Sequence, residues 1–211
     1  MMSKVSVRST IFALSTALGR SGVAVIRISG PEAGSILTLM APPRAQPRIF
    51  TLRKIIHPQN GTVLDKGMTL WLPGPKSFTG EDCAEFHIHG GRAVVRTVLE
   101  ALGRIPNCRL AEPGEFVRRA FENGKLDLAE AEGLADLLEA ETEAQRVQAL
   151  RHASGEFSRI IESWRSSIVE SLALVEAALD FSDEADVVKE TYENARRTIR
   201  VLETSLSHYL K

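Results

Sequence analysis

The chain has 211 residues, 44% hydrophobic and 25% charged, which is the composition of an ordinary globular protein. Its 26 basic and 27 acidic residues nearly cancel, so no global positive field attracts nucleic acid, and RNA binding would need a local patch or a partner. No run approaches 18 apolar residues, and the N-terminus lacks a signal-peptide core. The two cysteines, Cys83 and Cys108, have no framework spacing. We therefore expect a cytoplasmic protein.

The first half of the chain alternates β-rich runs with two helical patterns. Strands are predicted at 11–13, 23–28, 50–56, 63–72, 83–89 and 108–111. Ser29, followed by Pro31 and Glu32, indicates a capped helix start, and apolar spacing predicts a second helix at 92–102. We predict an α+β domain with a mixed sheet over residues 1–122.

The second half is helical in pattern. Beyond Pro113 proline is absent and glycine is rare; short helices are predicted at 115–122 and 126–140. Apolar residues spaced by 3, 4 or 7 predict one helix over 145–179, roughly 50 Å long at 1.5 Å per residue. After an acidic break at 180–186, a heptad-like stripe from Tyr192 to Tyr209 predicts a last helix. We expect an all-α segment over 123–211 in which the two stripes form a hairpin, and further helices beyond it.

The stretch richest in polar groups is 73–91, which reads PGPKSFTGEDCAEFHIHGG. Two turn signals precede a period-2 strand that places Glu85, His87 and His89 on one face. Three interpretations are open: a metal site, a partly buried acceptor for a ligand's N–H edge, or side chains that face solvent or bond within the core. Arg27 interrupts another apolar strand, and it either lies at a sheet edge with its charged group in water or reaches an acidic ligand.

Three long motifs carry a resemblance to a known family. They are GRSGVAVIRISG at 19–30, the stretch at 73–91, and RLAEPGEFVRRAFENGKLDLAEAE at 109–132. Together they closely resemble the MnmE (TrmE) family of tRNA-modification GTPases, from about Thr10 to about Glu184. The resemblance implies a tetrahydrofolate-binding, homodimer-forming N-terminal domain followed by the first part of a helical domain.

The resemblance also implies a function. With MnmG, a flavoprotein, the family adds an aminomethyl-type group (carboxymethylaminomethyl) at carbon 5 of the tRNA wobble uridine, and 5-formyl-tetrahydrofolate is the one-carbon source. The positions that contact the folate match Arg27, Glu85 and Lys125. One carboxylate can accept the paired N–H groups of a pterin, a role for Glu85, and the folate tail's carboxylates call for a cation, either Arg27 or Lys125. No catalytic or metal-binding residue is implied.

The chain lacks the GxxxxGK[ST] loop of a GTPase: Gly124-Lys125 is followed by leucine, with no glycine five residues upstream. GTP, magnesium and potassium would bind a GTPase domain outside this sequence, so this chain alone should not hydrolyse GTP. Two alternatives stay open. One is a folate-dependent aminomethyltransferase-like enzyme, and the other is a non-catalytic helical adaptor.

Overall fold

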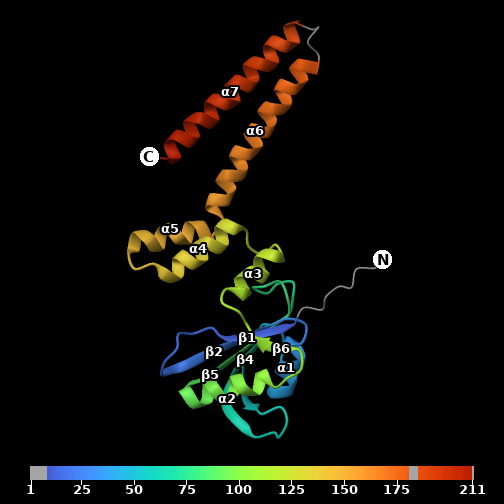
Figure 1. Cartoon of the computed structure of the whole chain (residues 1–211), viewed down its shortest axis with the longest axis vertical. Coiled ribbons are helices and arrows are strands. Elements are labelled where there is room, and N and C mark those ends of the chain that lie inside the picture. The colour runs from blue at the N-terminus through green and yellow to red at the C-terminus, as the bar shows by residue number, and fades with distance from the viewer. Residues whose placement is uncertain (1–8, 181–184, 211) are drawn as a thin grey trace, which may run out of the picture. The chain divides into compact units, whose positions relative to one another are not determined.

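The computed structural model describes residues 9–180 and 185–210. The chain divides into two compact units, Met1–Leu126 and Asp127–Lys211 (Figure 1). Within the described residues, no helix is both long enough and apolar enough to cross a membrane.

The N-terminal unit is built on one six-stranded sheet with the order β3-β4-β5-β2-β1-β6. Neighbouring strands are antiparallel, except that β1 and β6 are parallel. The strands are β1 (Thr10–Leu14), β2 (Ser21–Ser29), β3 (Thr51–Ile56), β4 (Val63–Leu72), β5 (Cys83–Gly90) and β6 (Cys108–Leu110). The predicted α+β class with a mixed sheet is therefore confirmed.

Alternation along the strands gives the sheet two different faces. Ile26 on β2 and Phe86 on β5 belong to one buried core, which also contains the apolar sides of α1 (Ala33–Met40) and α2 (Arg92–Gly103). Side chains alternate across a strand, so the next residues along, Arg27 and Glu85, point to the other face. Two helices thus bury one face, and the second face keeps its polar residues.

Two predictions about β2 are wrong. Arg27 is not at a sheet edge, because β2 lies between β5 and β1. Ser29 does not cap a helix: it ends β2, and its hydroxyl bonds Thr79 Oγ1 and Glu81 Oε2, each at 2.7 Å. These buried partners satisfy Ser29, so α1 begins only at Ala33 and has no side-chain cap.

The second unit consists of helices, as predicted, and its elements form two pairs (Figure 1). The first pair, α4 (Leu128–Glu139) and α5 (Glu143–Ala153), packs side by side. Each helix of this pair begins with a capping box, at Asp127 and at Thr142, which satisfies the first free backbone N–H groups.

The predicted single helix over 145–179 is wrong, because the chain breaks between α5 and α6 (Glu156–Asp180). Gly155 has a φ of +73°, a left-handed conformation that side chains with a Cβ rarely adopt. The N–H groups of Ser154 and Gly155 bond carbonyls of the last turn of α5, at Leu150 and His152. The apolar spacing continues through this cap, which is why periodicity alone does not reveal it.

The predicted hairpin is confirmed by contacts between α6 and α7 (Ala185–Tyr209). Trp164 Nε1 donates to Ser205 Oγ at 2.9 Å, and the Trp164 ring meets the Tyr209 ring edge-on at 5.4 Å. Small residues, among them Ala178 and Ala195, are buried in this unit. Residues 181–184 of the predicted acidic break lie outside the described residues.

Candidate ligand-binding site

The second face of the sheet brings two of the three expected site residues into direct contact. Arg27 and Glu85 are cross-strand partners on β2 and β5, and Arg27 Nε donates to Glu85 Oε1 at 3.0 Å. The Glu85 side chain is 11% exposed, while that of Arg27 is 31% exposed. A buried carboxylate needs such a partner, because burial without one is costly. The arginine therefore holds an acidic acceptor at the centre of the sheet.

Two aromatic side chains complete the surroundings of this ion pair. The guanidinium of Arg27 lies over the ring of Phe78, 5.3 Å from its centroid. His87 Nε2 lies 2.9 Å from Glu85 Oε2, and the rings of His87 and Phe50 are nearly perpendicular, with centroids 4.9 Å apart. Phe50 and Phe78 were not predicted as site residues, because neither carries a polar group, although Phe78 lies within the stretch 73–91.

The loop that carries Phe78 is fixed at several points. Thr79 bonds Ser29 of β2, and the Asn123 amide donates to the Thr79 carbonyl at 2.6 Å. Gly80 has a φ of +78°, and a Cβ there would lie 3.2 Å from side-chain carbons of Asn123 and Lys125. The loop therefore has one defined position over this face of the sheet.

Lys125, the third expected residue, follows α3 (Glu115–Glu122) and contacts the loop rather than the ion pair. Its side-chain carbons pack on Gly80, two residues from Phe78. Its ammonium group forms no hydrogen bond or ion pair with the described residues 9–180 and 185–210. The structure thus joins Arg27 to Glu85 directly and connects Lys125 to them through one loop.

A buried ion network ties α3 to the same loop. Arg119 is 4% exposed and donates to Glu81 Oε2 at 3.0 Å and to Glu115 Oε1 at 2.9 Å. The hydrogen bonds from the Arg109 side chain, helped by the Glu112 backbone N–H and by Arg119, lower the pKa of Glu115 to about 2, although burial acts in the opposite direction. The spacing of four residues between Glu115 and Arg119 could have indicated their ion pair from the sequence, because such residues are neighbours on a helix.

The metal interpretation of the Glu85, His87 and His89 face gains no support. His89 turns to β4, where its Nδ1 lies 2.8 Å from Asp65 Oδ1 and its backbone N–H donates to Asp65 Oδ2. Burial raises the pKa of Asp65, but these bonds from His89 outweigh it and the net pKa is lowered. Across residues 9–180 and 185–210, no three His, Cys, Asp or Glu side chains gather closely enough for a metal ion.

The two cysteines are free and buried. Burial raises the pKa of the Cys108 thiol to about 11, so it stays protonated at neutral pH. Cys83 Sγ lies 3.2 Å from Thr79 Oγ1. Cys108 is thus a small member of the hydrophobic core, whereas Cys83 packs among the hydroxyls of Ser29 and Thr79.

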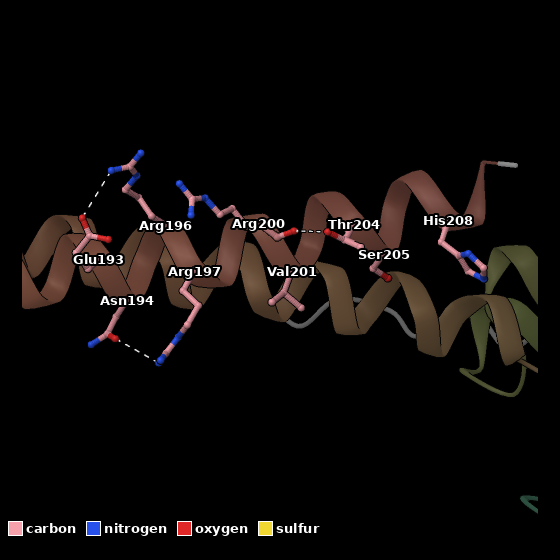
Figure 2. A pocket seen from close by; sticks show the side chains of 9 residues that line it. All are labelled: Glu193, Asn194, Arg196, Arg197, Arg200, Val201, Thr204, Ser205 and His208. Carbon is pink, nitrogen blue, oxygen red and sulfur yellow. Dashed lines mark hydrogen bonds and ion pairs between the residues drawn. The ribbon is translucent and has the colours of Figure 1, made fainter.

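Two hollows are lined by residues other than those around Arg27 and Glu85. A cavity of about 490 Å³ in the N-terminal unit is lined mainly by apolar residues, among them Leu14, Leu18 and Leu99. A groove of about 850 Å³ follows α7, with three arginines and several hydroxyls along it (Figure 2). Arg196 pairs with Glu193 at 3.6 Å in the same helix, and Arg197 bonds Asn194, so this groove resembles an ordinary solvated helix face.

The division of the chain into two units agrees with matches to two family models. Residues 10–125 match the family described as the GTP-binding protein TrmE N-terminus, and residues 128–211 match the MnmE helical domain. The chain belongs to the MnmE (TrmE) family. The junction between the two MnmE matches, at 125–128, coincides with the junction between the compact units at Leu126 and Asp127.

Similar proteins with related names occur in bacteria and in animals. A tRNA modification GTPase MnmE of Beijerinckia indica is 55% identical over 206 residues, which cover 98% of this chain and 45% of that protein. The mitochondrial 5-taurinomethyluridine-[tRNA] synthase subunit GTPB3 of Mus musculus is 52% identical over a stretch that covers 96% of this chain and 42% of that protein. A tRNA modification GTPase MnmE of Methylorubrum populi is 56% identical over a stretch that covers 84% of this chain and 40% of that protein. The chain spans less than half the length of these relatives.

Proposed function

We propose that this chain binds 5-formyl-tetrahydrofolate on the sheet face that carries Glu85, as the folate-binding part of a tRNA-modifying GTPase. The observation that carries the proposal is the buried Glu85 carboxylate, held by Arg27 at 3.0 Å on a face that the core helices leave free. An ion pair with a purely structural role does not need to lie at the centre of a sheet. A carboxylate that is held there in a fixed position is suited to accept hydrogen bonds from a ligand.

The chemistry of the surrounding residues fits a folate. A pterin presents an N–H and an amino group side by side, and a carboxylate can accept both. Arg27 uses only Nε for Glu85, so its terminal nitrogens are available for a carbonyl or a carboxylate. The Lys125 ammonium is a second cation for the folate tail, and the Phe78 ring offers a flat apolar surface. A bound folate would supply the one-carbon unit.

The names of the relatives support a proposal for the wider reaction. Their printed names describe tRNA modification GTPases and a 5-taurinomethyluridine-[tRNA] synthase subunit. We propose that the whole protein, with the flavoprotein MnmG, modifies carbon 5 of the tRNA wobble uridine in the cytoplasm. In this scheme a GTPase domain outside the present sequence hydrolyses GTP, and this chain holds the folate.

We also propose that the N-terminal unit forms a homodimer. Leu18 is 93% exposed and Val23 is 55% exposed, and such side chains are favourable to bury between protomers. Sedimentation equilibrium of the chain should give twice the monomer mass, and a monomer at micromolar concentration would contradict this part.

Calorimetric titration with 5-formyl-tetrahydrofolate tests the binding proposal. Saturable binding is expected for the unaltered chain, with a loss of at least about tenfold in affinity for Glu85→Gln, Arg27→Ala and Lys125→Ala. GTP in place of the folate should give no binding heat, because the chain has no phosphate-binding loop. A chain that is folded by circular dichroism and does not bind the folate would overturn the proposal.

A further inference from the structure

The two oxygens of the Glu85 carboxylate are held by two different donors. Arg27 Nε bonds Oε1 at 3.0 Å from the neighbouring strand, and His87 Nε2 bonds Oε2 at 2.9 Å from the same strand. A carboxylate offers about four acceptor positions, so two bonds leave about one on each oxygen. The carboxylate is therefore fixed in rotation while both oxygens remain able to accept a further hydrogen bond.

The His87 ring is itself held in place. It lies two residues along β5 from Glu85 and hence on the same face, and its side chain is 23% exposed. On its other side it meets the ring of Phe50, 4.9 Å away at an interplanar angle of 87°. An ionised carboxylate only accepts hydrogen bonds, so in this contact Nε2 of His87 carries the proton and donates it to Glu85 Oε2.

The second histidine of the motif behaves differently. His89 points to the same face, but its ring bonds Asp65 and its side chain is 70% exposed. The spacing His87-x-His89 therefore contains one residue that contacts the Glu85 carboxylate and one that pairs at the end of the strand. A substitution of His89 is therefore a matched control for substitutions of His87.

We infer that His87 is a positioning residue of the ligand site: it orients the Glu85 carboxylate so that both oxygens face the same pair of ligand donors. This inference rests on the proposed folate site. Without the Nε2 donor, only Oε1 of the carboxylate is hydrogen-bonded, and the carboxylate can rotate about the Cγ–Cδ bond of Glu85. A ligand with two parallel N–H groups would then have to restrict that rotation when it binds, which lowers its affinity. His87 thereby raises affinity for a paired donor edge without contacting the ligand.

The test is calorimetric titration with 5-formyl-tetrahydrofolate of the unaltered chain and of four variants. His87→Leu keeps an apolar contact with Phe50 and removes the donor, so it should bind about tenfold more weakly. His87→Gln restores an N–H donor on a side chain of similar reach and should bind within about threefold of the unaltered chain. His89→Ala should bind as the unaltered chain does, and Glu85→Gln should not bind.

The outcomes separate the two proposals. If the unaltered chain binds and Glu85→Gln does not, but His87→Leu binds normally, the positioning role is wrong while the folate site stands. If His87→Gln is as weak as His87→Leu, the hydrogen bond is not the cause, and the inference is overturned. If the unaltered chain does not bind, the folate site itself is wrong. Thermal unfolding by circular dichroism identifies any variant whose fold is lost. If His87→Leu does not fold, His87→Ala takes its place, because it also removes the donor and should bind about tenfold more weakly than the unaltered chain.

Discussion

The two units of this chain bury their apolar residues to very different extents. In the N-terminal unit, large side chains such as Ile26, Phe86 and Leu102 are fully buried. In the helical unit, the buried residues are small, and Ile168 and Leu172 on α6 remain 54% and 55% exposed. Hydrophobic burial is the main stabilising contribution to folding, so the first unit carries its own core and the second gains much less from its internal packing.

The same contrast holds for charged groups. Arg119 and Glu115 are buried and paired with each other in the N-terminal unit, whereas Arg165 and Glu162 on α6 form an exposed pair at 2.8 Å. Buried charges are strongly destabilising when one partner is removed, while exposed pairs contribute little. The candidate site therefore lies in the unit whose interactions are fixed, and variants in that unit should show the larger effects.

The largest effect is expected from breaking the buried network. Arg119→Ala removes the guanidinium that lies between Glu81 and Glu115, and should lower the free energy of unfolding of the N-terminal unit by about 4 kcal/mol. Urea unfolding can be followed by Trp71 fluorescence in a Trp164→Phe background, since the chain has two tryptophans. Arg165→Ala is the exposed control in the helical unit, followed by Trp164 fluorescence in a Trp71→Phe background and expected to cost below about 1 kcal/mol. Equal losses would remove the contrast.

A matched pair of isoleucines compares apolar packing in the two units. Ile26→Ala empties a fully buried position and should cost about 3 kcal/mol in the same urea measurement. Ile168→Ala truncates a half-exposed side chain and should cost below about 1 kcal/mol, followed by Trp164 fluorescence in a Trp71→Phe background. A cost at Ile168 as large as at Ile26 would mean that α6 is buried in solution.

Acid should weaken the N-terminal unit through Glu115. Its pKa falls from 4.5 to about 2 on folding, first because of the Arg109 hydrogen bond, so the stabilisation is complete above pH 4.5 and is lost as the pH falls toward 2. The loss can reach about 3 kcal/mol. Glu115→Gln should flatten this part of the curve of unfolding free energy against pH, and an unchanged slope would argue against the depressed pKa.

The smallest effect is expected at the break between α5 and α6. Gly155→Ala forces a residue with a Cβ into a left-handed conformation and should cost about 1 kcal/mol in the helical unit. The matched control is Gly91→Ala, because Gly91 has an ordinary extended backbone and its added Cβ would lie 3.9 Å from the nearest atom. A stabilised Gly155→Ala chain would indicate one continuous helix in solution.

Sequence patterns predicted best those helices and strands whose ends and side-chain periods depend on neighbouring residues. Strand β4 and helix α3 have the predicted bounds, because turn residues flank each of them and their side-chain periods are clear. The break at Gly155 was missed because the apolar spacing on either side stays in phase. Ser29 was misassigned because its partners, Thr79 and Glu81, lie about fifty residues away.

The polar residues of the candidate site could be predicted from the sequence, but the contacts between them could not. Glu85 could be selected from its strand position, and the family resemblance supplied Arg27 and Lys125. The Arg27–Glu85 pairing depends on the order β5-β2 in the sheet, which no local pattern determines. The contacts of Phe78 with Arg27 and of Phe50 with His87 are also tertiary, and such side chains carry no polar signal in the sequence.

The most direct test of the account is amide hydrogen exchange of the chain with and without 5-formyl-tetrahydrofolate. Slower exchange is expected in peptides that contain Arg27, Glu85 and the loop around Phe78, with no change in α6 and α7. Protection confined to α6 and α7, or no protection at saturating folate, would contradict the assignment of the ligand site to the sheet of the N-terminal unit.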